Sequence, residues 1–424
     1  MLSQRRERRD RLTVLHLAQP VEGGVARVVT DLAWAQTREA VRVVVACPEG
    51  GSLAREAAAA GAEVEHWAAV REPGPRVPAE TRRAYQLIQQ VRPDVVHAHS
   101  AKAGLAVRLA LRGRIPTVYQ PHAWSFEAVE GGAARAARAW ERWAARWTDR
   151  VLCVSEAERR TGERAGIRAR WEVVHTGVDL EDFVVPDPYR TAGTGRDDAG
   201  PAAGAAVPAD RGADADADAA QRAAARAALP ALRAMPPGAP LVVCVGRLCA
   251  QKGQRTLLDA WPRIAAGVPG ARLVLVGDGP DRRQLTEGAP DGVLFAGASA
   301  EVSRWYAAAD LAVLPSRWEG MALTPLEAMA CGRPVVVTDV GGARECLPPG
   351  QEDVCLVPPG DPAALATAVT HLLRDPGLRA HLGEAAHKHV AAEFDVRRTA
   401  ASVLRLYREL VAARASEDTE RTAR

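Results

Sequence analysis

The sequence lacks several features that would place a chain of 424 residues in a special class. Its charge is nearly balanced, with 55 Lys and Arg against 52 Asp and Glu, so no overall field favours nucleic acid as a partner. No stretch approaches the roughly 18 consecutive apolar residues of a membrane span. The apolar run that follows the basic N-terminal residues is too short for a secretion signal. We therefore expect a cytoplasmic protein, with peripheral contact to the inner face of a membrane left open.

Cysteine pairs and metal-binding motifs are also missing. The seven cysteines form no CxxC pair, which is the spacing typical of zinc sites and redox motifs. We therefore interpret them as reduced cysteines of the core. DxD strings occur only inside the Ala-Asp run at 214–218, and the dinucleotide fingerprint G-x-G-x-x-G does not occur. We therefore expect no bound metal and no cofactor.

Short β-branched runs alternate with longer helix-patterned segments along most of the chain. Continuous apolar runs suit strands that are buried on both faces, so the alternation predicts parallel, doubly wound sheets. Because single cores stop growing near about 250 to 300 residues, we expect two Rossmann-like domains. The expected strands are 12–17, 41–47, 94–99, 116–120, 150–155 and 171–175, then 241–246, 272–277, 293–297, 311–316 and 333–339.

Between these two sets of strands the composition changes to repeated Pro, Gly, Ala and Asp, which favours disorder over a packed core. Ligands of doubly wound domains bind outside the carboxyl ends of the strands, so we expect a cleft between the domains. The expected boundaries are a basic tail at 1–11, an N-terminal domain at 12–185, a linker at 186–238 with a disordered insertion at 190–220, a C-terminal domain at 239–385, helices at 386–414 that cross back to the first domain, and a disordered tail at 415–424.

A glycine pair follows the first expected strand. Gly23 and Gly24 would let the backbone approach a ligand closely, and the helix-patterned segment behind them would offer free amides and a positive dipole end to a phosphate. A plain flexible turn explains the pair equally well.

Two cations follow the expected strand at 241–246. Arg247 ends this strand, and Lys252, five residues on, is one of only three lysines in the chain. A guanidinium can bind phosphate oxygens through two parallel hydrogen bonds, while an ammonium adds a mobile point charge. The alternative is that both are solvated surface cations.

Two glutamates separated by seven residues follow the fourth expected strand of the second domain. Thr324, Pro325 and Glu327 fit a capping box in which Thr324 is the N-cap, so Glu327 has a structural explanation. Glu319 neither caps nor pairs in the pattern. The same helix start is expected to aim backbone amides from Met321 onward into the cleft.

Histidines follow two strands of the first domain. His122 comes directly after the strand at 116–120, where its ring could hold a hydroxyl or a developing charge, although a single loop histidine more often has a structural role. His97 and His99 alternate along a strand end. We expect these two to point to opposite faces of the sheet, to be packing or loop residues and not to share a metal; a position of His99 near the cleft is the alternative.

The segments occur together, and in the same order, in a known enzyme family. Gly23-Gly24, VHAHSAKAG, PHAWSF, CVSE, HTGVD, VGRLCAQKG, LVLVGDGP and the Glu-x7-Glu block ending EAMACGRPVVVTDVGG follow one another. Over about residues 12–410 the chain therefore resembles the retaining glycosyltransferases of family 4, which have the α/β GT-B fold. HTGVD departs from the commoner asparagine before the glycine, and the insertion at 190–220 has no family counterpart that we recognise.

The resemblance implies a role for each candidate residue. Arg247 and Lys252 would hold the donor diphosphate, Glu327 the nucleotide ribose and Glu319 the transferred sugar, and His122 would contact that sugar. The catalytic set would be His122, Glu319, Arg247 and Lys252. The donor-binding set would be Gly23, Gly24, Arg247, Lys252, Gly320, Met321, Ala322, Leu323 and Glu327.

The family implies a metal-independent, retaining hexosyltransferase that uses a nucleotide-diphosphate sugar in polysaccharide, glycolipid or small-molecule glycoside synthesis. Two rival functions share the fold: a nucleotide-sugar 2-epimerase, which needs no acceptor, and a non-catalytic domain that only binds sugar or partners. The EAMACG segment favours a transferase over an epimerase, and the intact set of Arg247, Lys252, Glu319 and Glu327 argues against a non-catalytic domain. The motifs leave the acceptor and the oligomeric state undefined.

A helix rich in tryptophan and arginine is expected at residues 133–147. At about 100° per residue, Trp140, Trp143 and Trp147 fall within one stripe and four arginines gather on another face. The ordinary interpretation is that the tryptophans pack on the sheet and the arginines are solvated. The functional one is that this helix docks on anionic lipid and brings the enzyme to a lipid-linked acceptor.

Overall fold

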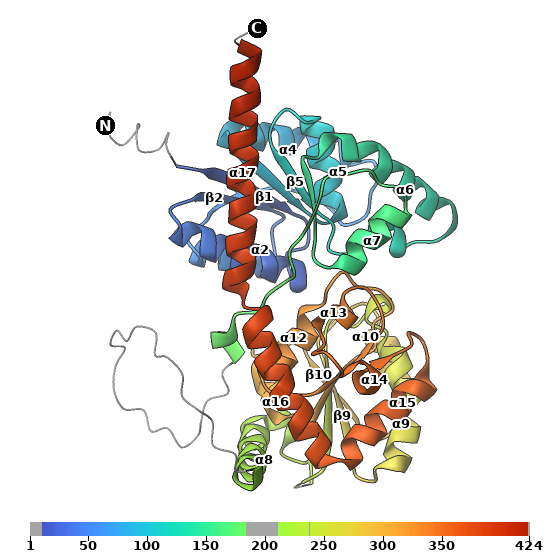
Figure 1. Ribbon diagram of the computed structural model, residues 1–424. Coiled ribbons are helices and arrows are strands. Elements are labelled where there is room, and N and C mark those ends of the chain that lie inside the picture. The colour runs from blue at the N-terminus through green and yellow to red at the C-terminus, as the bar shows by residue number, and fades with distance from the viewer. Residues whose placement is uncertain (1–10, 184–210, 237, 423–424) are drawn as a thin grey trace.

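The computed structural model describes residues 11–183, 211–236 and 238–422, which form two α/β domains (Figure 1). The N-terminal sheet has seven strands in the order β3-β2-β1-β4-β5-β6-β7, and the C-terminal sheet has six in the order β10-β9-β8-β11-β12-β13. The strand pairs in both sheets are parallel. The chain runs outward from the central strand of each sheet, returns and runs outward again, so the prediction of two doubly wound domains is confirmed.

The strands lie close to the β-branched runs that predicted them. They are β1 Thr13–Ala18, β2 Arg42–Cys47, β3 Glu63–His66, β4 Val95–His99, β5 Thr117–Gln120, β6 Arg150–Cys153, β7 Trp171–Val173, β8 Leu241–Val245, β9 Arg272–Val276, β10 Val293–Gly297, β11 Leu311–Leu314, β12 Val335–Thr338 and β13 Leu356–Val357. The pattern missed β3, whose side chains are mostly exposed, and β13, which has only two residues.

Helices cover both faces of each sheet. The α-helices are α2 Gly24–Arg38, α3 Leu53–Ala59, α4 Val77–Val91, α5 Ser100–Leu111, α6 Gly131–Ala144, α7 Glu156–Arg164, α8 Arg211–Ala228, α9 Gln254–Gly267, α10 Arg282–Glu287, α11 Val302–Ala308, α12 Leu323–Ala330, α13 Ala343–Cys346, α14 Glu352–Cys355, α15 Pro362–Arg374, α16 Pro376–Glu393 and α17 Val396–Thr422. Short 3-10 helices are η1 Ser125–Glu127, η2 Ala145–Trp147, η3 Leu180–Phe183, η4 Pro230–Leu232 and η5 Ala250–Lys252.

Helix α8 contradicts the prediction of disorder for residues 211–220, while 190–210 lie outside the described residues. Its alanines are the strongest helix formers. The helix also docks on the C-terminal domain, because Arg222 and Arg226 pair with Asp310 at 3.3 and 2.6 Å. This contact with the C-terminal domain could not be predicted from the composition of the segment.

The last two helices lie on different domains, and the crossing begins later in the chain than predicted. α16 packs on α12 of the C-terminal domain, and α17 crosses to the N-terminal domain, where it packs on α2 (Figure 1). The crossing therefore begins at Val396 rather than at residue 386. α17 continues to Thr422, so the disordered tail predicted at 415–424 is wrong for 415–422. Each added helical residue contributes a backbone hydrogen bond once a helix is nucleated.

The cysteines belong to the core, as predicted. All seven are buried and carry free thiols. Burial raises the pKa of Cys47 to about 11 and that of Cys244 to about 12, so these thiols stay protonated at neutral pH. Within the described ranges, the helices include none that is long and apolar enough to cross a membrane.

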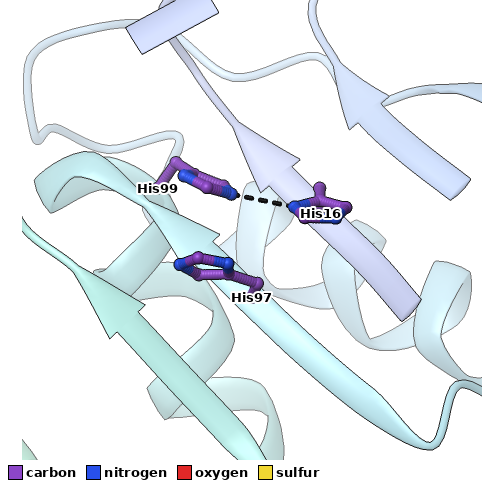
Figure 2. A group of neighbouring side chains, drawn as sticks. All are labelled: His16, His97 and His99. Carbon is purple, nitrogen blue, oxygen red and sulfur yellow. Dashed lines mark hydrogen bonds between the residues drawn. The ribbon is translucent and has the colours of Figure 1, made fainter. Parts of the chain in front are cut away.

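Three buried histidines lie side by side on one face of the N-terminal sheet (Figure 2). His16 comes from β1, and His97 and His99 come from β4. The expectation that His97 and His99 face opposite ways is wrong, because side chains alternate along a strand and residues two apart share a face. Their ring centroids are 3.9 Å apart.

Candidate active site at the domain boundary

Loops at the carboxyl ends of the two sheets meet at the boundary between the domains. Gly24 begins α2 and lies against Leu323 at the start of α12: a Cβ atom on Gly24 would be 3.7 Å from Leu323 Cδ1. Nearby, the Ser155 hydroxyl donates to the Gly320 carbonyl at 3.1 Å. The predicted glycine pair and the predicted segment 320–323 are therefore neighbours in space.

An ion pair lies in this region. Lys252 Nζ is 2.5 Å from Glu319 Oε1, and the two side chains are 17% and 10% exposed. Ser316 Oγ donates to the same carboxylate oxygen at 2.8 Å, and Gln251 Nε2 donates to Oε2 at 3.3 Å. Glu319 and Ser316 also line a pocket whose other walls are mainly apolar. Three donors thus hold the Glu319 carboxylate in place.

Two glycines make this approach of loops possible. Gly253 has φ +65°, and a Cβ atom there would lie 2.0 Å from the Pro315 carbonyl oxygen. Gly341 has φ +50°, and a Cβ atom there would lie 2.1 Å from the Glu319 carbonyl oxygen. A side chain at either position would clash with the facing carbonyl oxygen. It would also strain the backbone of the substituted residue, because that residue has a positive φ. Glycine therefore lets η5 carry Lys252 against the loop that holds Glu319.

Arg247 lies on the same loop but is exposed. Its carbonyl accepts a hydrogen bond from Gln254 Nε2 at 3.0 Å, which ties the loop to α9. Arg71 lies in the loop before α4 of the N-terminal domain, close enough to Arg247 for the two charges to repel. Desolvation lowers the pKa of Arg71, and repulsion from Arg247 lowers it further. Two guanidiniums that repel each other across a boundary favour an anion between them.

Glu327 is not part of a capping box, contrary to the prediction. α12 begins at Leu323 with Ala322 as its N-cap and has no side-chain cap. Pro325 therefore lies within the first turn, where its missing N–H leaves no unmade hydrogen bond. The Tyr306 hydroxyl donates to Glu327 Oε2 at 3.3 Å. Burial raises the pKa of Glu327 to about 7, against the opposing charge of Arg27 and the Tyr306 hydrogen bond.

His122 lies in a strained turn after β5. His122 and the next residue, Ala123, have φ of 55° and 89°, a left-handed conformation that is uncommon outside glycine and gathers at functional sites. Glu158 holds the turn: its carboxylate accepts from the backbone N–H of Ala123 at 2.6 Å and of Val154 at 2.8 Å. The same turn abuts Gly320 of the other domain, since a Cβ atom there would be 2.9 Å from Ala123 N.

Sequence reasoning missed Glu158, and a usable signal was present. Ser155 and Glu158 have the S-x-x-E spacing of a capping box, and Ser155 Oγ accepts from Glu158 N at 3.0 Å as the N-cap of α7. Burial raises the pKa of Glu158 to about 7, although its two backbone donors oppose the rise. Arg71 lies in none of the sequence motifs, so its place near Arg247 becomes apparent only in the folded structure.

His175, in the unusual HTGVD segment, joins the two domains. Its Nε2 lies 3.0 Å from Glu345 Oε2, and the Glu345 carboxylate accepts hydrogen bonds from the amides of Glu156 and Ala157 at the start of α7. Burial alone would raise the pKa of Glu345, but His175 and the two amides lower it overall. An acidic side chain from the C-terminal domain thus occupies the positive end of an N-terminal helix.

The amino-acid sequence matches two family models, one on each domain. Residues 22–182 match Glycosyltransferase Family 4, and residues 239–375 match Glycosyl transferases group 1. The chain belongs to the family 4 glycosyltransferases. The family predicted from the order of the motifs is therefore confirmed.

Two curated relatives are mannosyltransferases. Lipopolysaccharide core biosynthesis mannosyltransferase LpcC of Rhizobium leguminosarum bv. viciae is 35% identical over 41% of this chain and 52% of its own length. The GDP-mannose-dependent monoacylated alpha-(1-6)-phosphatidylinositol monomannoside mannosyltransferase of Corynebacterium glutamicum is 35% identical over 37% of this chain and 43% of its own length. The matched part thus spans about half of each relative or less.

A solved structure matches nearly the whole chain. The crystal structure of Anabaena HepE in complex with UDP and glucose has a TM-score of 0.73 and is 23% identical, and the match covers 94% of this chain and 100% of that one. At this identity the likeness establishes the fold. The GT-B fold predicted for the family is therefore confirmed.

Proposed function

We propose that this protein transfers a hexose from a nucleotide-diphosphate sugar to an acceptor. The observation that carries the proposal is the Lys252–Glu319 pair, which lies where the carboxyl edges of both sheets meet. The names of the relatives support it: LpcC is a mannosyltransferase, the Corynebacterium relative is GDP-mannose-dependent, and HepE binds UDP and glucose.

The proposed chemistry follows from the charges at this boundary. When a nucleotide sugar breaks its C–O bond, negative charge grows on the diphosphate leaving group. Arg247 and Lys252 would stabilise that charge from the C-terminal domain, and Arg71 would add a guanidinium from the other side. Preorganised charges of this kind usually supply the largest part of catalysis. The amides of the first turn of α12 would bind the same anion.

Groups at the other end of the site would hold the sugar. Glu319, fixed by three donors, would place its carboxylate near the anomeric carbon, where it can support positive charge. His122 would contact a sugar hydroxyl from the N-terminal domain. Because Glu319 and His122 come from different domains, the site is complete only when the two domains lie together. Retention of the anomeric configuration is proposed from the family membership.

A donor screen tests this function. The full-length protein is incubated with UDP-, GDP- and ADP-hexoses, and release of the nucleoside diphosphate is measured with and without candidate acceptors. The proposal expects one donor to give nucleotide release and, with the right acceptor, a glycosylated product. Conversion of the donor to its 2-epimer would identify the rival epimerase. Binding of the donor with neither reaction would identify a non-catalytic sugar-binding domain.

Metal dependence gives a second measurement on the active donor. Because Arg247 and Lys252 are proposed to neutralise the leaving group, activity is expected to change less than about twofold in excess EDTA. Activity that disappears in EDTA and returns with Mg²⁺ or Mn²⁺ would contradict this assignment of charge stabilisation. The control adds EDTA that has been saturated with Ca²⁺.

Replacing Glu327 with glutamine should separate its proposed ribose contact from its effect on stability. The pKa of this carboxyl is about 7 in the folded protein against 4.5 in the unfolded chain, so the folded state binds more protons between these values and loses stability as the pH rises through them. Glu327→Gln should therefore melt no lower than wild type at pH 8. UDP or GDP affinity should fall about tenfold at pH 8, because a charged acceptor of hydroxyl bonds is lost, and less at pH 6.

Titration calorimetry and thermal unfolding at both pH values measure the Glu327→Gln variant. Glu301→Gln, at an exposed surface glutamate, is the control. A fall in melting temperature at pH 8 with unchanged nucleotide affinity would assign Glu327 a structural role only.

A second part of the proposal is that helix α6 and η2 contact an anionic membrane. The face of α6 that packs inward carries Ala134, Glu141 and Ala144, with Glu141 paired to the buried Arg108 at 2.8 Å. Trp143 is 43% exposed, so not all the tryptophans pack on the sheet. The four arginines of the segment, Arg135, Arg138, Arg142 and Arg146, are exposed. Exposed tryptophan beside arginine suits an anionic interface.

Cosedimentation with phosphatidylglycerol vesicles tests the membrane contact. We expect binding at low salt that weakens at high salt, and Arg135→Glu with Arg138→Glu should weaken it at least about tenfold, because each arginine near a charged surface contributes about 1 kcal/mol. Arg283→Glu, on exposed α10 of the other domain, is the control. Equal binding by all three proteins, or no binding at low salt, would reject the contact.

A further inference from the structure

A row of hydrogen bonds leads from helix α2 to His122 through the buried histidines. Gln36 Oε1 lies 2.9 Å from His16 Nε2, and His16 Nδ1 lies 2.9 Å from His99 Nε2. His99 Nδ1 lies 3.1 Å from His122 Nε2. Figure 2 shows the central link, with His16 and His99 joined across β1 and β4. Gln36, His16 and His99 are each 1% exposed or less.

In such a row each ring determines the proton position of the next. A neutral imidazole has one nitrogen that donates and one that accepts. Because the Gln36 carbonyl oxygen only accepts, His16 carries its proton on Nε2 and accepts at Nδ1. His99 then donates from Nε2 and accepts at Nδ1. His122 therefore donates from Nε2, and its Nδ1 is left as an acceptor.

The orientation of one amide sets this direction. If the Gln36 amide were flipped, its NH₂ group would donate to His16. The donor and acceptor nitrogens of His16, His99 and His122 would then all be exchanged. In the structure the Gln36 Oε1 faces His16 Nε2 at 2.9 Å, and the Nε2 of the same amide is buried and makes no hydrogen bond within the described residues.

The row needs neutral rings, and burial provides them. Burial lowers the pKa of His16 to about 4 and that of His122 to about 3, and it lowers the pKa of His99 well below its usual value. A metal shared by His16, His97 and His99 is the competing interpretation, since one nitrogen of each lies within 4.8 Å of the others. In the structure these nitrogens have other partners: His16 Nδ1 lies 2.9 Å from His99 Nε2, and His97 Nδ1 lies 2.5 Å from the Tyr407 hydroxyl.

We propose that Gln36, His16 and His99 are positioning residues that hold His122 as the Nε2–H tautomer, so that its Nδ1 accepts a hydrogen bond from a hydroxyl of the transferred sugar. The proposal rests on the proposed function, because it concerns the ring that would contact that sugar. With His122 in this tautomer, the enzyme selects sugars that carry a hydroxyl opposite Nδ1, because a hydroxyl can donate a hydrogen bond to that nitrogen. A sugar with a carbonyl, an ether or hydrogen in place of that hydroxyl would lose the contact.

Histidine tautomers are read directly by two-bond ¹H–¹⁵N correlation spectra of the ¹⁵N-histidine-labelled full chain, with His122→Gln used to assign the signals of that ring. Wild type should show His122 with its proton on Nε2. Gln36→Met, which keeps the length of the side chain but removes the acceptor, should give signals averaged between the two tautomers. Gln90→Met, at an exposed glutamine of α4, should leave His122 unchanged.

Kinetics on the donor found by the screen give a second readout. Gln36→Met and His99→Phe, which cuts the row at its middle ring, should each lower kcat about tenfold, the effect of one misdirected hydrogen bond. UDP or GDP affinity should stay at the wild-type value, which also shows that the variants are folded. Because both break the same row, the double variant should lose no more activity than the worse single one.

Two kinds of failure are distinguishable. A wild-type His122 that carries its proton on Nδ1, or a Gln36→Met variant with unchanged His122 signals and wild-type kcat, would overturn the positioning proposal. Absence of transfer with every donor, alongside an Nε2–H tautomer that depends on Gln36, would instead overturn the proposed function and leave the tautomer assignment in place. Zn²⁺ that shifts the signals of His16, His97 and His99 together at stoichiometric amounts would favour the metal site and overturn the row.

Discussion

Lys252→Ala is expected to lower turnover at least about a hundredfold while the protein stays folded. Removing the ammonium takes away a charge-assisted contact that strengthens as the leaving group forms. It also leaves Glu319 without its cation, so an uncompensated carboxylate would face the incoming diphosphate. Steady-state kinetics with the active donor measure the effect, and kcat should fall more than the affinity for UDP or GDP.

The control for this variant is Lys388→Ala, because Lys388 is another of the three lysines and lies exposed on α16, paired with Glu384. Arg247→Ala should lose a similar factor, although its exposed position predicts that more of the loss appears in donor binding. Turnover of Lys252→Ala within a few-fold of wild type would remove Lys252 from the proposed catalytic set.

Glu319→Gln is expected to lower turnover by a comparable factor for a different reason. The amide keeps the size of the side chain and can still accept from Ser316, but it carries no charge to support a positive anomeric carbon. It also frees Lys252 from its partner, so UDP or GDP should bind at least as tightly as in wild type. The pair of measurements, turnover down and nucleotide affinity kept, distinguishes Glu319 from the phosphate-binding cations.

The Glu319→Gln result is compared with Ser316→Ala, which removes one donor to the same carboxylate but keeps its charge. Ser316→Ala should lose less than about tenfold. If Glu319→Gln turned over as fast as wild type, the carboxylate would be only a structural partner of Lys252.

The fold could be read largely from the sequence, because strands buried on both faces demand apolar β-branched runs. Leu241–Val245 and Val335–Thr338 lie where those runs predicted them. The edge strand Glu63–His66 was missed, since its side chains are mostly exposed and carry charge. Helix α8 was missed because its ion pairs are made with Asp310, which lies far along the chain.

The candidate site could be predicted only in part, because several of its contacts join residues that are distant in the sequence. The scarcity of lysine singled out Lys252, but its contact with Glu319 depends on the left-handed backbone at Gly253, which no motif displays. The start of α12 was misplaced because a proline inside the first turn fits as well as a proline at the first position. The histidine row was missed because its members come from β1, β4 and the β5 loop, and only parallel pairing aligns them.

The most direct test of the central claim is the structure of the protein with a bound nucleotide sugar. The account predicts that the diphosphate lies at the domain boundary within hydrogen-bond distance of Arg247 and Lys252, with the ribose at Glu327 and the sugar between Glu319 and His122. A nucleotide bound elsewhere, or a diphosphate at this boundary that contacts neither Arg247 nor Lys252, would contradict it.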